Sequence, residues 1–232
     1  MSEQENINKK VKENGKKIFL ISLSLTISVL ILVFLIKMLF VNSKINEGRF
    51  RVSDVILTSG AEFIDKSKET GVWAYDVWQN NTLALLINTS GADISRAYIT
   101  NVQAFNSGVE VSQKGTDTSI VSGSASELEL ATDVSDEGDV LYEIDITNKA
   151  VLNNFEIPSD ITEIKHDATI FALAGLKTDD MKFSVSFVLN IEEKNGRENT
   201  MNVSIDLPCG NIVESGVTVT RQNLENFVFK MK

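Results

Sequence analysis

Residues 183–207 read FSVSFVLNIEEKNGRENTMNVSIDL, and their alternation decides the fold class. An apolar residue stands at every second position from 183 to 191 and again from 201 to 207. A period of two is typical of a strand with one face in the core and the other in water. Residues 194–196 between the two runs include Asn-Gly, a frequent turn sequence. This stretch therefore predicts an antiparallel β-hairpin.

The length of this turn follows from the register of the two strands. A two-residue loop Asn195–Gly196 would place the two apolar faces on opposite sides of the hairpin. A three-residue loop 194–196 instead pairs Leu189 with Met201, so that both apolar faces coincide. We therefore predict a type I turn in which Gly196 is left-handed and forms a G1 bulge.

Further strand patterns follow the N-terminal quarter of the chain. Alternation or enrichment in β-branched and aromatic residues predicts strands at 82–88, 94–105 and 139–147. Residues 168–174 (ATIFALA) are apolar throughout, which predicts a central strand covered on both faces. The pattern is that of a mainly β domain.

Two other segments of the domain are not predicted to be strands. Ser59–Glu62 matches a Ser-x-x-Glu capping box and predicts a short helix ending near Gly71. Residues 122–138 are rich in Ser, Gly and acidic residues, and form either a long loop within one sandwich or a linker between two halves. Many short strands with polar turns predict an antiparallel, Ig-like β-sandwich over residues 52–232.

A membrane helix is predicted ahead of this domain. Residues 18–41 read IFLISLSLTISVLILVFLIKMLFV, with no charge before Lys37. About 20 apolar residues span a bilayer, and backbone groups in lipid are satisfied within a helix. We predict a retained anchor. The alternative is a signal peptide that is cleaved before Lys44, which would remove residues 1–43.

The flanks of this helix predict its orientation. The tail 1–17 carries five lysines, two of which adjoin the helix. Lys and Arg favour the cytoplasmic side, so we predict a cytoplasmic tail and an extracytoplasmic C-terminal domain at the plasma membrane. Residues 42–51 are polar and are interpreted as a stalk. Pairs of Ser and Thr on the helix leave helix-mediated dimerisation, and hence a homo-oligomer, as an open hypothesis.

The charge of the domain excludes one class of partner. Sixteen of the 22 Lys and Arg residues and 29 of the 32 acidic residues follow residue 41, which gives that part a formal charge of −13. Nucleic-acid binding depends on neutralising phosphates with basic side chains. We therefore expect no nucleic acid among its partners.

The sequence also argues against catalysis. It contains one histidine, His166, and one cysteine, Cys209, and no catalytic signature surrounds either. His166 is interpreted as part of an exposed turn, and Cys209 as a buried thiol, since one cysteine permits no internal disulfide. We predict that the chain is not an enzyme and requires no cofactor.

Two groups of residues are candidates for ligand binding. Trp73 and Tyr75 would share one face of a strand and could stack on a glycan, although such aromatics more often fill a core. Four carboxylates around Gly138 are candidates for Ca²⁺, but EF-hand spacing fails and a solvated acidic loop is the favoured interpretation. These carboxylates are Asp133, Asp136, Glu137 and Asp139.

Two hypotheses for function follow. The first is a non-catalytic, membrane-anchored envelope or surface protein that presents an acidic β-sandwich to other proteins, as an accessory or structural part of a larger assembly. Unpaired sheet edges would provide its contacts. The alternative is an extracytoplasmic module that binds a glycan or Ca²⁺.

Overall fold

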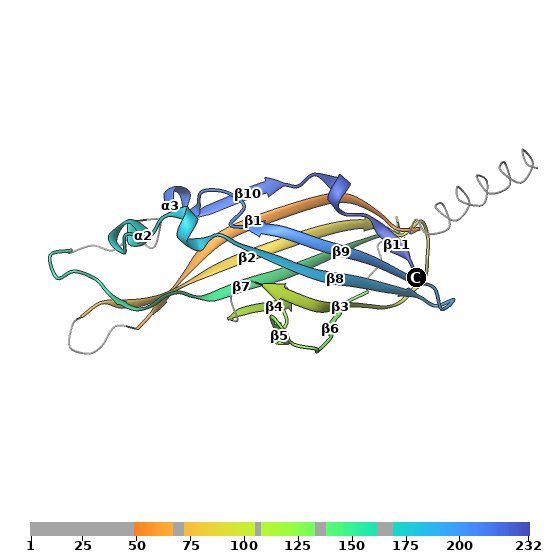
Figure 1. Cartoon of the computed structure of the whole chain (residues 1–232), viewed down its shortest axis with the longest axis horizontal. Helices are drawn as coiled ribbons and strands as arrows, with labels where there is room; N and C mark the ends of the chain where they lie inside the picture. Colours follow the sequence, from red (N-terminus) through yellow and green to blue (C-terminus); the bar gives the residue numbers. More distant parts are fainter. Residues whose placement is uncertain (1–48, 67–71, 105–107, 133–137, 162–168) are drawn as a thin grey trace, which may run out of the picture. The chain divides into compact units, whose positions relative to one another are not determined.

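The computed structural model describes residues 49–66, 72–104, 108–132, 138–161 and 169–232 (Figure 1). The predicted tail, the predicted membrane helix and residues 42–48 lie outside these ranges. Within them, no helix is long and apolar enough to cross a membrane. The domain can therefore be described, and the anchor stays a prediction.

The prediction of a mainly β fold is confirmed, since two antiparallel sheets make up the domain as in a β-sandwich (Figure 1). The six-stranded sheet has the order β10-β1-β2-β7-β4-β5 and the five-stranded sheet the order β11-β9-β8-β3-β6. The strands of the first are β10 (Val217–Arg221), β1 (Arg51–Asp65), β2 (Ala74–Asn88), β7 (Asp139–Glu156), β4 (Val109–Gln113) and β5 (Ser119–Val121). Those of the second are β11 (Phe229–Met231), β9 (Glu198–Leu207), β8 (Phe183–Glu193), β3 (Ile94–Ala104) and β6 (Leu128–Leu130).

The predicted hairpin is confirmed in its register and in its turn. Leu189 pairs with Met201, and the last pair before the loop joins Glu192 to Glu198. The Gly196 N–H donates to the Glu193 carbonyl at 2.9 Å, and Gly196 has a φ of 84°. These are the features of a type I turn followed by a G1 bulge.

The predicted helix at Ser59–Gly71 is wrong, because residues 51–65 form strand β1. The Ser59 hydroxyl is fully buried and accepts a hydrogen bond from the Cys209 N–H at 2.9 Å, so it caps no helix. Tertiary pairing with β2 and β10 decides this segment, and its short capping pattern does not.

The predicted central strand at 168–174 is also wrong. Its described part forms the one-turn helix α2 (Thr169–Leu173). The neighbouring residues Ile170 and Phe171 are both fully buried, as they would be in a strand covered on both faces, so burial does not separate the two structures. A short apolar run without a period does not distinguish a strand from a buried helix. The other short helices are η1 (Thr178–Met181), α3 (Ile212–Ser215) and η2 (Leu224–Asn226).

The described end of the predicted stalk is part of the domain. Phe50 is 2% exposed and packs edge-on against Phe229, with 5.7 Å between ring centroids. The Arg49 N–H donates to the Asn199 side chain at 3.3 Å, and Arg51 opens β1. Residues 49–51, which were assigned to the stalk, therefore pack as part of the sandwich.

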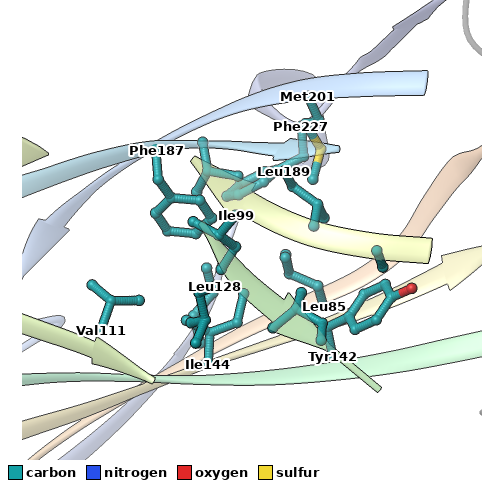
Figure 2. Close-up of a cluster of buried hydrophobic side chains, with 14 of the residues drawn as sticks. Leu85, Ile99, Val111, Leu128, Tyr142, Ile144, Phe187, Leu189, Met201 and Phe227 are labelled. Atoms are coloured by element: carbon teal, nitrogen blue, oxygen red, sulfur yellow. The ribbon is translucent and has the colours of Figure 1, made fainter. Parts of the chain in front are cut away.

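A first hydrophobic cluster lies between the two sheets, with side chains from both (Figure 2). Leu85 and Ile144 come from the six-stranded sheet, and Ile99, Phe187 and Leu189 come from the five-stranded sheet. The alternation predicted for 82–88 and 139–147 supplies much of this core.

A second cluster lies where β1, β2 and β7 extend beyond the first, and the helices α2 and α3 contribute to it. It contains Val77, Phe171 and Ile212, all fully buried. Buried polar side chains stand on the strands between the two clusters: Ser59, Gln79, Asn81 and Asn148. The long strands thus connect two hydrophobic clusters through a polar layer.

Candidate protein-contact surface

Strand β10 forms one edge of the six-stranded sheet and pairs with β1 alone (Figure 1). Its sequence, VTVTR, alternates valine and threonine, which are β-branched residues that favour strands. The register pairs Val219 with Thr58 and Val217 with Gly60. Because Gly60 has no side chain, Val217 lies over its backbone.

The backbone of β10 leaves hydrogen-bonding groups unpaired within the described sheet. The Gln222 N–H donates to the Val55 carbonyl of β1 at 2.8 Å. Polar backbone groups alternate in direction along a strand, so Thr218 and Thr220 also face β1. Val219 and Arg221 then direct their N–H and C=O groups away from the sheet.

The inner side of β10 is packed tightly on the segment that crosses over from β9. The Thr220 hydroxyl donates to the Cys209 carbonyl at 2.9 Å, and the Cys209 thiol lies 3.3 Å from the Thr218 carbonyl. A Cβ on Gly210 would lie 3.0 Å from Thr218. These contacts fix β10 in place and leave its outer side open.

That outer side is apolar. Val217 and Val219 are 55% and 64% exposed, and Val219 is the most exposed of the large hydrophobic side chains in the described residues. Leu141 on β7 and Val121 on β5 are also exposed on the outer face of this sheet. Leu141 is three strands from β10 and Val121 is on the opposite edge, and the same face carries the ion pairs Lys114–Glu143 and Lys149–Glu110. The exposed valines of β10 are therefore a local apolar strip at the sheet edge, of the kind that another protein can cover.

The outer face of the five-stranded sheet also carries polar side chains. Its outward residues on β8 and β9 are mainly polar, including Ser184, Asn202, Ser204 and Asp206. On β3, the Arg96 guanidinium lies 4.2 Å from the centre of the Tyr98 ring and pairs with Glu129 at 2.8 Å. Burial and neighbouring glutamates raise the pKa of Tyr98 to about 12. The exposed polar residues of β8 and β9 indicate that this part of the face is solvated, whereas Tyr98 is buried.

The strands at the three other ends of the sheets in the described domain are shorter than β10. Strands β5, β6 and β11 have three residues each, and two of them carry an outward charge, Glu129 on β6 and Lys230 on β11. Short length and charge are devices that prevent edge-to-edge pairing. Strand β10 has five residues, and its single charge, Arg221, is held by Asp54 at 2.9 Å.

The two aromatic candidates have different environments. Tyr75 is 6% exposed and belongs to the second cluster, whereas Trp73 is 39% exposed just before β2. Burial raises the pKa of the Tyr75 hydroxyl. The structure therefore does not present the two rings together as an open platform.

Three of the four calcium candidates, Asp133, Asp136 and Glu137, lie outside the described residues. Asp139 accepts a hydrogen bond from the Asn88 amide at 2.8 Å. Among the residues that the structure describes, no group of three or more potential metal ligands forms.

The remaining sequence candidates and the surface hollows add no reactive group. His166 lies outside the described ranges, and the Cys209 thiol is half-buried beside β10. A hollow of about 540 Å³ at the start of β8 has Lys182 as the one titratable residue in its described lining. Lys182 pairs with Asp179 at 2.5 Å, which lowers the pKa of that carboxyl.

Sequence reasoning missed β10. The signal that would have found it is the alternation of Val and Thr in residues 217–221. Alternation alone does not show that a strand lies at an edge or that its valines face outward. Comparisons with protein families, curated proteins and solved structures found no match for this chain.

Proposed function

We propose that this chain is a non-catalytic, single-pass membrane protein that presents its β-sandwich to other proteins, as an accessory or structural part of a surface assembly. The observation that carries the proposal is the open edge at β10 with its exposed valines. Residues 18–41 would hold the domain at the plasma membrane, with the N-terminus in the cytoplasm and the domain outside.

The two sheet faces support a protein partner over a small ligand. An unpaired edge whose valines are exposed offers backbone hydrogen bonds and apolar contact to an extended segment of another protein. A glycan site needs exposed aromatic rings that act together, and Tyr75 is buried. Trp73, which is 39% exposed, is the one observation that favours the alternative of ligand binding.

The proposal is tested by chemical cross-linking in cells that make the full chain, followed by purification. Val217→Lys together with Val219→Lys should abolish the cross-linked protein partner, because charges on the two exposed valines of β10 oppose their burial. Asn202→Lys is the matched control on the other sheet and should keep the partner. The proposal fails if the double variant keeps the partner, or if wild type has none and a glycan array gives a Trp73-dependent signal.

A further inference from the structure

The open edge of β10 also indicates what one partner of the chain is, and this inference rests on the proposed function. We propose that two copies of the chain pair antiparallel through β10, about a two-fold axis at Val219. Their six-stranded sheets would then join into one continuous sheet across the two molecules.

The hydrogen-bonding groups of β10 fit this arrangement. An axis at Val219 places Val219 opposite its own copy, and Val217 opposite Arg221 of the second copy. These are the residues whose N–H and C=O groups face away from β1, so each faces a residue with matching groups. The Val217 carbonyl already accepts from the Ser215 hydroxyl at 2.9 Å and has a second lone pair for the partner.

The side chains are also compatible with self-pairing. Valine would lie opposite valine at the axis, and β-branched pairs across strands favour sheet formation. Arg221 would lie opposite Val217 and not opposite another arginine, so no like charges meet directly. The guanidinium of Arg221 keeps its own partner, Asp54.

The distribution of charge permits contact between two copies at this edge. Residues 42–232 carry a formal charge of −13, so two domains repel each other over most approaches. In the paired segments Ile56–Gly60 of β1 and Val217–Arg221 of β10, the one charged residue is Arg221. This nearly neutral strip allows close contact without placing carboxylates against carboxylates.

The same geometry limits the assembly to two copies. A two-fold contact uses the same surface on both molecules and is closed. The strands at the three other sheet ends in the described domain have three residues each, so they offer less backbone for pairing than β10 does. The inference is thus a closed dimer and not a filament.

The contact is small, which sets the conditions for observing it. A pair of five-residue strands buries less than the roughly 1,200–2,000 Å² of stable interfaces, so dimers should dissociate in dilute solution. Attachment to a shared membrane raises the effective concentration, typically to the millimolar range for short tethers. The experiment therefore uses the full chain in vesicles of phosphatidylcholine.

The first test is disulfide cross-linking of Val219→Cys, in a chain that also carries Cys209→Ser. Paired strands lie about 4.8 Å apart, so the two new thiols should form a disulfide on mild oxidation. Thr58→Cys is the matched control: it lies one strand further inside each sheet, about 14 Å from its copy. At least a tenfold excess of dimer for Val219→Cys over the control is expected. Equal cross-linking of the two variants overturns the inference.

The second test does not depend on a new thiol. Fluorescence energy transfer between labelled copies in vesicles should fall at least threefold for Val219→Lys. It should be unchanged for Val121→Lys, which is on the opposite edge of the same sheet and is also exposed. If Val219→Lys leaves the energy transfer unchanged, another surface holds the dimer, and the inference is contradicted. If the chain still cross-links to a different protein in cells, that result would support the proposed function even though the dimer is ruled out.

Discussion

Glu193 is a buried carboxylate at the point where the described chain enters the sandwich. It is 3% exposed and accepts hydrogen bonds from the amides of Asn199 at 3.1 Å and Asn195 at 2.9 Å. The Arg49 guanidinium lies 3.4 Å from the same carboxylate. Burying a charge is costly unless it is paired and hydrogen-bonded, so these contacts hold Arg49 against the β8–β9 turn.

The first prediction concerns Asn199, which is fully buried. Asn199→Leu should lower the free energy of unfolding by about 3 kcal/mol, because it removes a donor to a buried carboxylate and an acceptor for the Arg49 N–H. Urea unfolding of the full chain measures it. Asn202→Leu, exposed on the same strand, should change stability by less than about 0.5 kcal/mol. Equal losses for the two variants would show that the Glu193 cluster contributes little.

A second prediction concerns Tyr142, whose hydroxyl is buried without a hydrogen-bond partner (Figure 2). Burial raises the pKa of this hydroxyl well above its usual value. Tyr142→Phe removes the unsatisfied group and keeps the ring, so we expect the free energy of unfolding to rise by up to about 1 kcal/mol. The same unfolding assay tests this, and a loss of stability would mean that the hydroxyl has a partner.

The three tyrosines together predict a response to alkaline pH. Burial is the main cause that raises the pKa of Tyr75, Tyr98 and Tyr142 in the folded domain, that of Tyr98 to about 12. Unfolded tyrosines ionise near pH 10, so between about pH 10 and 12 the unfolded state binds fewer protons. Stability should therefore fall as pH rises through this window. Tyrosinate absorbance that appears near pH 10 while the domain stays folded would be inconsistent with this burial.

At the scale of single residues, the sequence places side chains on faces but does not say how those faces are covered. The sequence predicts that Trp73 and Tyr75 share a face, and only Tyr75 is buried. Burial at this end depends on α2 and α3, which pack there through contacts distant in sequence. Alternation in β2 carries no information about them.

At the scale of elements, the β8–β9 hairpin and β10 mark the two extremes of predictability. Register and turn chemistry are local, so the three-residue loop with Gly196 followed from the sequence alone. The edge position of β10 depends on the crossing from β9 over residues 208–216, for which no local pattern exists. The false capping box at Ser59–Glu62 has the same cause, because pairing with distant strands overrides a local signal.

A prediction at this scale tests the turn. Gly196 has a φ of 84°, a conformation that costs L-residues about 1 kcal/mol or more. Gly196→Ala should lower the free energy of unfolding by about 1 kcal/mol. Gly108→Ala is the control, since Gly108 is not among the glycines with positive φ and a Cβ there would meet no atom within 4 Å. Thermal unfolding that ranks the two variants in the reverse order would contradict the turn assignment.

At the scale of the whole domain, the polar layer divides the hydrophobic interior. Gln79 and Asn81 are almost fully buried, and the Gln79 Oε1 atom has no hydrogen-bond partner. Burial of these polar side chains adds little to the stability of the domain. The two hydrophobic clusters should therefore unfold locally and independently of each other. The predictable part at this scale was the mainly β class. The sequence does not predict that the hydrophobic interior is divided into two clusters. This division depends on how far β1, β2 and β7 extend beyond the five-stranded sheet.

Substitution in each cluster tests this division. Phe171→Ala should speed amide exchange in residues 61–65 and 74–77, because it removes a fully buried ring from the second cluster. Exchange around Leu85 and Ile144 should stay slow. Phe187→Ala should instead speed exchange in the first cluster. Uniform acceleration by Phe171→Ala would show that the domain opens as one unit.

The most direct measurement of the central claim is amide hydrogen exchange along β10 in the full chain, in vesicles at low and high surface density. Contact through the open edge should slow exchange at Val219 and Arg221 at high density by at least tenfold. Thr218 and Thr220, which already face β1, should exchange at the same rate at both densities. Equal rates at Val219 and Arg221 at both densities would contradict pairing through this edge.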